Sequence, residues 1–201
     1  MCEVMRPQIV IINENTLSAM ALRMLLVDIV GNNIDVVYHS SFEEFQASEH
    51  GVVPHFFVSA DTVFRHSAFF RDIARRTIVI TEGDAPTFTQ SGFHTIDATA
   101  SEQVIARQIL NIRNAGHGSG HPHPQQPATS ELPMLLSQRE QEVLALLVKG
   151  YINKEVADRL NISLATVIFH RNNISEKLQT RSLGRMTIYA VLNNIVSLSE
   201  L

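Results

Sequence analysis

Residues 137–182, SQREQEVLALLVKGYINKEVADRLNISLATVIFHRNNISEKLQTRS, decide how the C-terminal part of this 201-residue chain folds. Ser137 can cap a helix, and Glu140 three residues later completes a capping box. Gly150 can end that helix, because glycine tolerates the left-handed conformation at a helix C-terminus. Asn153 can cap a second, short helix, which a tight turn at 161–163 joins to a third. This pattern is typical of a helix-turn-helix, whose second helix enters the major groove of DNA.

The third helix of the segment follows Asn161, which accepts positive φ, and Ser163, which can cap it. Helical spacing places one apolar stripe inward, formed by Val167, Ile174 and Leu178, and turns another side away from the domain, formed by Ala165, Ile168, Phe169 and Asn172. Apolar groups can contact thymine methyls, and Asn can pair with adenine. We therefore expect Ile168, Phe169 and Asn172 to face DNA bases. The alternative is that Ile168 or Phe169 belongs to the core or to an inter-domain contact.

Cationic and polar side chains surround this helix, and we expect them to contact the DNA backbone: Lys154, Thr166, His170, Arg171 and Lys177. Any one of them has the alternative role of an ordinary solvated residue. The formal net charge of the whole chain is -4, but six Lys or Arg face three Asp or Glu between residues 153 and 185. This excess of basic residues is modest, which favours a homodimer that combines two half-site contacts.

Three stretches of this segment, SQREQEVL, GYINKEVADRLNIS and TVIFHRNNISEKL, resemble the LuxR/FixJ-type (NarL-like) regulators in order and spacing. The resemblance implies a four-helix domain over 131–201 that binds double-stranded DNA in the bacterial cytoplasm, with RNA polymerase or a sensor protein as further partners. It also implies that Thr166 and His170 hold the DNA backbone. Two positions depart from the family: Ile168 replaces a frequent Lys or Glu, and Gln179 stands where Gly usually ends the helix.

A fourth helix is expected over 182–197, and its apolar positions are Met186, Ile188, Tyr189, Val191, Leu192, Ile195 and Val196. This is more apolar surface than the cap of three short helices requires. Part of the helix therefore serves as a dimer seam, or all of it belongs to the domain core.

A linker is expected over 114–130, because Gly, Pro, Ser and Gln dominate this stretch and it carries no charge. His117, His121 and His123 lie in it without the spacing of a zinc site, so we predict no metal. Cys2 is the only cysteine, which favours a reducing compartment. We see no charged-then-apolar leader and no apolar run long enough for a bilayer, so we expect no membrane association.

Residues 1–113 alternate strand-length apolar runs with amphipathic helices. Strands are predicted at 8–12, 34–38, 55–58, 77–81 and 93–96. Helices are predicted at 16–30, 41–48, 62–75 and 101–113, with a weaker segment at 86–91. This alternation predicts an α/β flavodoxin-like doubly wound fold with a parallel sheet and a crevice at the carboxyl ends of its strands.

Placed before such a helix-turn-helix, this half resembles a response-regulator receiver domain. A working receiver is expected to hold Mg²⁺ on an acidic pair, an acceptor Asp, a hydroxyl and a Lys at the strand ends. The corresponding positions here are Asn13 and Glu14, Ala60 followed by Asp61, Thr81, and Asp97. The acceptor position is therefore Ala60, and only one carboxylate of the pair remains.

No lysine precedes Lys149, so the receiver lysine is absent in any alignment register. Repulsion among the remaining carboxylates disfavours phosphorylation, at about 1 kcal/mol or more for each uncompensated contact. We therefore predict a pseudo-receiver that serves dimerisation or partner sensing. The alternatives are a phosphorylation-activated regulator with acceptor Asp61, or a ligand-sensing domain. No catalytic constellation or phosphate loop is visible, so we predict neither enzymatic activity nor a cofactor.

Overall fold

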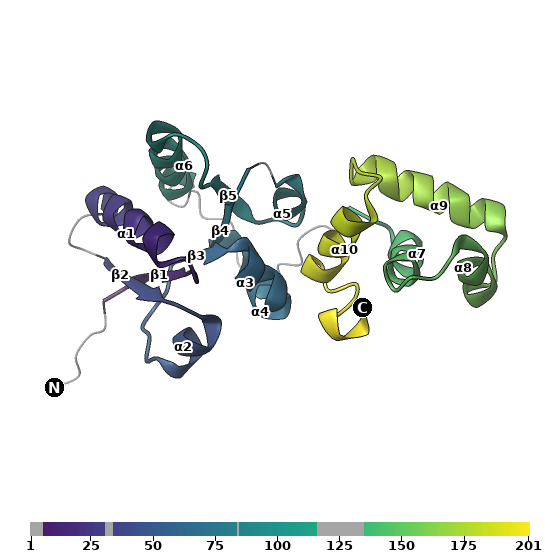
Figure 1. Ribbon diagram of the computed structural model, residues 1–201, viewed down its shortest axis with the longest axis horizontal. Helices are drawn as coiled ribbons and strands as arrows, with labels where there is room; N and C mark the ends of the chain where they lie inside the picture. Colours follow the sequence, from purple (N-terminus) through teal and green to yellow (C-terminus); the bar gives the residue numbers. More distant parts are fainter. Residues whose placement is uncertain (1–5, 31–33, 84, 116–134) are drawn as a thin grey trace, which may run out of the picture. The chain divides into compact units, whose positions relative to one another are not determined.

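The computed structural model describes residues 6–30, 34–83, 85–115 and 135–201 (Figure 1). Contacts group the chain into two compact units. The first comprises Met1–Val63, Ile73–Ala85 and Phe93–Glu131, and the second comprises Phe64–Asp72, Pro86–Gly92 and Leu132–Leu201. The predicted division into 1–113, 114–130 and 131–201 stays a prediction. Most of the predicted linker, with its three histidines, lies outside the described residues, as does Cys2.

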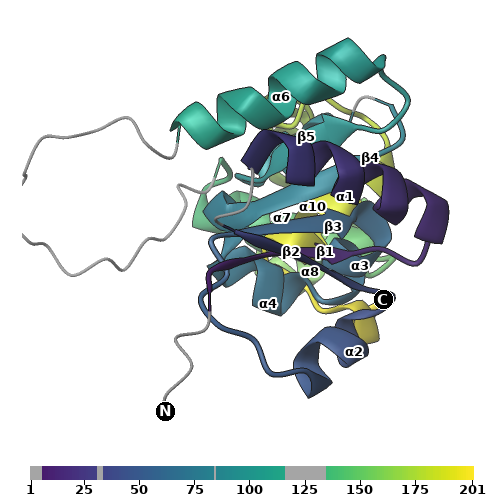
Figure 2. The ribbon, with the colours of Figure 1, turned by 90° about the vertical axis from the view of Figure 1, so that its left-hand side faces the viewer.

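A five-stranded parallel sheet forms the centre of the first unit (Figure 2). Its strands are β1 (Gln8–Ile12), β2 (Asp35–His39), β3 (His55–Ser59), β4 (Thr77–Thr81) and β5 (His94–Asp97), in the order β2-β1-β3-β4-β5. This order is that of the flavodoxin-like doubly wound fold. The predicted fold class is confirmed, and each strand lies within one residue of its expected position.

Helices α1 (Thr16–Val30) and α6 (Glu102–Ala115) cover one face of the sheet, and α2 (Phe42–Ala47) covers the other (Figure 2). Leu22, Leu26 and Ile109 from α1 and α6 pack on Ile9 and Ile11 of β1 in one core cluster. Both helices therefore hold the same face of the sheet. Helix α6 runs two residues into the predicted linker.

The helix expected over 62–75 is wrong, because the structure has three short helices there. They are α3 (Ala60–Arg65), α4 (Ser67–Asp72) and the 3-10 helix η2 (Ala74–Arg76). The Ser59 hydroxyl accepts a hydrogen bond from the Thr62 amide, which starts α3 directly after β3. The path breaks at His66, whose carbonyl accepts from the amides of Phe69 and Phe70.

The C-terminal helices of the second unit are α7 (Gln138–Val148), α8 (Asn153–Leu160), α9 (Leu164–Lys177) and α10 (Leu183–Leu192), followed by η3 (Leu198–Glu200). Their core includes Val143, Leu144, Val156, Val167 and Ile174, each fully buried. This confirms the expected four-helix arrangement. The same unit contains α4 and α5 (Pro86–Gln90), which agrees with the predicted segment 86–91.

Helix α10 is shorter than expected, since it ends at Leu192 rather than near Ser197. Asn193 caps it, and Asn194 turns the chain with φ 54°. Met186, Tyr189 and Val191 are at most 3% exposed, which favours the interpretation of α10 as a core helix. No helix in the described ranges combines the length and the apolar character that crossing a membrane would require.

Candidate nucleic-acid interface

Local caps fix the path of the chain from α7 to α9. The Ser137 hydroxyl and the Glu140 carboxylate form the expected capping box, and Gly150 follows α7 with φ 91°. Asn161 ends α8 with φ 52°, and the Ser163 hydroxyl accepts from the Thr166 amide at 3.1 Å. These predictions are confirmed, and the caps together determine where α9 begins.

The expected cap of α8 by Asn153 is wrong. Ile152 occupies the cap position, and its amide donates to the Glu155 carboxylate at 2.9 Å. Asn153 is the first helical residue instead, and its side-chain oxygen accepts from Arg171 Nη1 at 3.2 Å. This hydrogen bond joins the start of α8 to the middle of α9.

Helix α9 has two distinct faces. Val167 and Ile174 are fully buried, and Leu178, which ends the helix, is 4% exposed. On the outer side Ile168 is 44% exposed and Phe169 is 60% exposed, with Asn172 exposed one turn further along. The structure thus brings the three predicted base-facing side chains onto one accessible surface. Neither Ile168 nor Phe169 is a core residue.

The predicted backbone-contacting residues differ in what they bind within the chain. Lys154 is exposed and forms no ion pair among residues 135–201. The Thr166 hydroxyl is paired with the Ser163 hydroxyl at 2.8 Å. His170 is half-buried, and its Nδ1 is buried without a partner among the described residues, so a contact from this ring to a phosphate has to use Nε2.

Lys177 is held by an ion pair inside the domain. Its Nζ lies 2.6 Å from Oε2 of Glu140, whose side chain is only 5% exposed. Burial would raise the pKa of Glu140, but the hydrogen bonds from Lys177 and Ser137 outweigh it and hold this pKa below its ordinary value. The position of Lys177 therefore has a structural explanation that the sequence did not reveal.

A surface hollow of about 540 Å³ lies beside α9 and is lined in part by Lys154, Arg171 and Arg181. Leu164, Ile168 and Leu183 add apolar surface to it. Arg181 forms no ion pair among the described C-terminal residues and is a further candidate for a phosphate contact that we did not single out from the sequence. The signal for it was the basic excess between residues 153 and 185.

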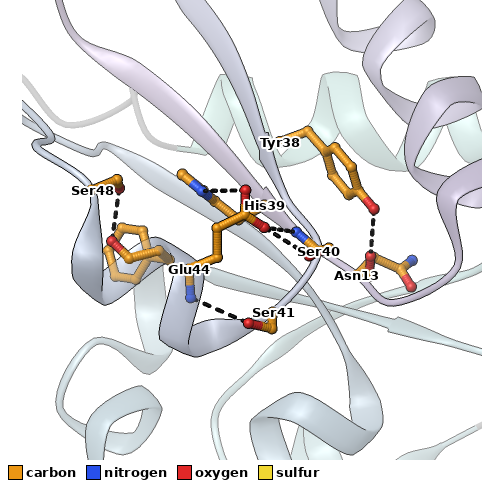
Figure 3. A network of polar contacts seen from close by, with 8 residues as sticks. Asn13, Tyr38, His39, Ser40, Ser41, Glu44 and Ser48 are labelled. Atoms are coloured by element: carbon orange, nitrogen blue, oxygen red, sulfur yellow. Dashed lines mark hydrogen bonds and ion pairs between the residues drawn. The ribbon is translucent and has the colours of Figure 1, made fainter.

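The second predicted site, which we call the strand-end pocket, is formed by residues at the carboxyl ends of β1, β3, β4 and β5. At β1, Asn13 is buried and its side-chain oxygen accepts from the Asn15 amide at 2.9 Å. The Tyr38 hydroxyl donates to the Asn13 carbonyl at 3.1 Å (Figure 3). Next to it, Ser40 and Ser41 hydrogen-bond the Glu44 carboxylate and amide, which fixes the start of α2 (Figure 3).

Thr81 and Asp97 are also bound within the pocket. The Thr81 hydroxyl lies within hydrogen-bonding distance of the carbonyls of Gly83, at 3.0 Å, and Ile96, at 3.3 Å. Asp97 Oδ1 accepts from the Gly83 amide and from the amide and hydroxyl of Thr99, and the Thr99 hydroxyl lowers the pKa of Asp97 most. Both side chains therefore stabilise the loops after β4 and β5.

Ala60 and Asp61 form the first turn of α3, and Asp61 and Glu14 are exposed. The donor set fits Mg²⁺ poorly, because the side-chain oxygen of Asn13 and one oxygen of Asp97 already accept from amides. No group of three possible metal ligands occurs among the described residues.

Comparison with known proteins agrees with this geometry. Residues 134–190 match the family described as bacterial regulatory proteins, luxR family. The oxygen regulatory protein NreC of Staphylococcus haemolyticus is 36% identical over 76 residues, which are 38% of this chain and 35% of NreC. The response regulator VraR of Staphylococcus aureus is 39% identical over 67 residues, which are 33% of this chain and 32% of VraR. The matched stretch spans about a third of the length of these curated relatives.

Solved structures share the fold over nearly the whole chain. RcsB from Salmonella enterica serovar Typhimurium, bound to the promoter rprA in the presence of the phosphomimetic BeF3-, has a TM-score of 0.57 at 14% identity. The alignment covers 95% of this chain and 100% of RcsB. Two RcsB dimers bound to two parallel DNAs give a TM-score of 0.57, also at 14% identity, over 93% of this chain and 98% of that one. At 14% sequence identity, the similarity to these structures shows a shared fold and nothing more about this chain.

Proposed function

We propose that this chain, whose residues 134–190 form a LuxR-family helix-turn-helix domain, is a sequence-specific DNA-binding transcription regulator that acts as a homodimer. The observation that carries the proposal is the outer face of α9, where Ile168, Phe169 and Asn172 are exposed beside Lys154 and Arg171. Apolar side chains can contact thymine methyls, Asn can bind adenine, and the cations can contact phosphates. RcsB, which has a similar fold, binds DNA as dimers, and this supports the homodimer.

Selection from random duplexes by the full-length protein tests this function. We expect enrichment of sites with two related half-sites, since two copies of α9 would read symmetric sequences. Phe169→Ala should lose the enrichment, whereas Phe69→Ala, which also removes an exposed phenylalanine, should keep it. Failure of the wild-type protein to prefer any duplex over random competitor would refute the proposal.

The proposal extends to the first unit, which acts as a pseudo-receiver for dimerisation or for sensing a partner. Thr81 and Asp97 support this role, because their polar atoms hydrogen-bond within the pocket and leave a phosphoryl group few partners. The absence of lysine from residues 1–148 supports it as well, since no ammonium can neutralise phosphate charge there.

Incubation of the full chain with acetyl phosphate and Mg²⁺ tests the pseudo-receiver. We expect no acid-labile phosphate on the protein. Stable phosphate that is abolished by Asp61→Asn would instead establish the phosphorylation-activated alternative. A metabolite that raises the melting temperature of the wild-type protein would establish the ligand-sensing one.

A further inference from the structure

The first two turns of α9 have an apolar outer surface without charge. Leu164, Ile168 and Asn172 follow one another at intervals of four residues, so they lie in one row along the helix, and Phe169 lies next to Ile168. Leu164 is 48% exposed, so it is a large apolar side chain open to solvent, as Ile168 and Phe169 are. Residues 164–170 contain no Asp, Glu, Lys or Arg. When α9 lies in the major groove, the groups nearest the bases are therefore mostly hydrocarbon.

The cations near α9 lie to one side of this surface. Lys154, Arg171 and Arg181 line the hollow beside the helix. Of the two adjacent apolar residues, Ile168 also lines the hollow and Phe169 does not. This separation assigns the cations to the phosphates, which carry the negative charge of DNA, and leaves the base edges to the apolar outer surface.

Each base presents different groups in the major groove. Guanine presents two acceptors, which Arg or Lys binds, and cytosine presents a donor, which binds Asp or Glu. Thymine alone presents an apolar group, its 5-methyl. An isoleucine or phenylalanine gains free energy when it removes this methyl from water, whereas against a G·C pair it would leave polar groups without hydrogen-bond partners. Glu176, exposed one turn beyond Asn172, can accept from cytosine but cannot donate to guanine.

We propose that α9 recognises thymine through its methyl group, with Ile168 and Phe169 as the specificity-determining side chains. This inference rests on the proposed function and deepens it by naming the chemical group that is recognised. The substrate class is duplex DNA whose half-sites carry two thymine methyls in the major groove and no guanine at these two positions.

The spacing of the side chains also predicts where adenine lies in the half-site. Ile168 and Asn172 are four residues apart, which is about 6 Å along the helix. Successive base pairs are about 3.4 Å apart along the duplex. With α9 along the groove, the adenine that Asn172 binds therefore lies about two base pairs from the thymine that Ile168 contacts.

Uracil substitution in the DNA tests the proposal without changing the protein. The duplex is the site that the full-length protein selects, and uracil replaces thymine at one position at a time, which removes only the methyl group. Burial of one methyl corresponds to about a fourfold change in affinity, so the dissociation constant should rise about fourfold at each of two positions per half-site. Uracil at the remaining thymines should change nothing. Equal affinities for the thymine duplex and all the uracil duplexes would overturn the proposal.

Substitutions in α9 assign each methyl to its side chain. Ile168→Ala should lose the sensitivity to uracil at one of the two positions and Phe169→Ala at the other, because a methyl that no side chain covers can be removed without cost. Leu198→Ala is the matched control, since Leu198 is a 40% exposed apolar residue of the same unit but lies in η3. It should keep both sensitivities. Sensitivity that persists at both positions in both α9 variants would contradict the assignment.

5-Methylcytosine separates contact with the methyl from recognition of DNA shape. A·T-rich duplexes also differ in groove width and stiffness, which a protein can recognise without touching a methyl. Replacement of a sensitive T·A pair by C·G should weaken binding, and 5-methylcytosine in the same place should recover about fourfold, because it restores the methyl on a G·C pair. If cytosine and 5-methylcytosine bind equally, shape explains the preference and the proposal fails.

Ile168→Lys tests the specificity in the opposite direction. Lys is frequent at this position in the regulators that the sequence resembles, and its ammonium can bind N7 and O6 of guanine. Because Ile168 is exposed, the variant should fold as the wild type does. Selection by this variant should enrich guanine at the position where the wild type enriches the thymine of Ile168. Continued enrichment of thymine there would show that Ile168 does not contact that base.

Selection by the wild-type protein separates failure of this inference from failure of the proposed function. If no duplex is enriched, the DNA-binding function fails, and recognition of the methyl fails with it. If a site is enriched but its affinity depends on no thymine methyl, the DNA-binding function stands and only recognition of the methyl is refuted.

Discussion

The outer face of α9 and the strand-end pocket use similar polar side chains in opposite ways. On α9, the Asn172 amide has no side-chain partner among the described residues, and Lys154 on the neighbouring α8 has no ion pair among residues 135–201. In the pocket, Thr81 and Asp97 have partners, Gly83 and Thr99, in the loops that follow β4 and β5. The difference teaches that a polar side chain at a motif position indicates a binding site only when its atoms are not already hydrogen-bonded within the protein.

The largest effect is expected for Lys177→Met, which leaves the buried Glu140 carboxylate without its cation. Breaking such a pair should lower the free energy of unfolding by about 2 to 3 kcal/mol, less than for a fully buried pair because Lys177 is half-exposed. Urea denaturation of the full chain measures it. Lys154→Met is the control: its stability should be unchanged, while the salt dependence of its DNA affinity becomes shallower. If Lys177→Met has wild-type stability but binds DNA more weakly, Lys177 contacts the DNA backbone, as the sequence predicts, and the ion pair with Glu140 contributes little to stability.

Asn172→Ala should cost about 1 to 3 kcal/mol of binding free energy at a selected site and relax specificity at one base pair. Titration of wild-type and single-substituted duplexes measures both effects. Asn111→Ala removes an exposed asparagine from α6 and should change neither. If Asn172→Ala leaves the specificity unchanged, Asn172 does not contact a base.

Thr81→Val should change the stability of the protein and not its affinity for DNA. The buried hydroxyl lies near the carbonyls of Gly83 and Ile96, so its loss should lower the free energy of unfolding by about 1 to 2 kcal/mol. Affinity for DNA should be that of the wild type, measured at a temperature where both proteins are folded. A change in DNA affinity without a change in stability would show that the strand-end pocket does more than hold its loops.

Gln179→Gly should stabilise the protein by about 0.5 to 1 kcal/mol. Gln179 follows α9 with φ 50°, and the Thr180 amide donates to the Ser175 carbonyl as in a glycine-ended helix. Thermal unfolding measures the gain. Asn161→Gly, at φ 52°, is the matched control and should gain less because asparagine tolerates this conformation better. Equal or reversed gains would contradict this account of strain.

The smallest effect concerns pH near the strand-end pocket. Burial lowers the pKa of His39 below its ordinary value of 6.5, more than Glu44 raises it. The unfolded chain therefore binds a proton before the folded one, and the free energy of unfolding should decrease as pH falls below 6.5. Unfolding curves between pH 7.5 and 5.5 should be flatter for His39→Phe than for the wild type. An unchanged slope in His39→Phe would remove His39 as the cause.

The helix ends and the order of strands and helices could be predicted from the sequence, because each depends on residues close together in the chain. Ser137, Gly150, Asn161 and Ser163 each fix the backbone within a few residues, and the alternation of strands and helices gave the sheet with its parallel order. The break at His66 and the end of α10 at Leu192 carried no comparable signal.

Ion pairs and hydrogen bonds between residues far apart in the chain could not be predicted from the sequence. Lys177 and Glu140 are 37 residues apart, and nothing near either one indicated the ion pair. The Arg171 hydrogen bond to Asn153, across 18 residues, was equally hidden. The assignment of base and backbone contacts on α9 stays a prediction, because exposure tells which side chains are available and DNA decides which are used.

The Glu140 carboxylate has a consequence for the motions of the domain. It accepts from the Ser137 amide at the start of α7 and from Lys177 in the last turn of α9. Fraying of either end therefore releases a ligand of the same group and weakens the other end. We expect amide hydrogens in these two turns to exchange with deuterium at correlated rates, as one cooperative opening, which would keep α9 from tilting independently of the domain.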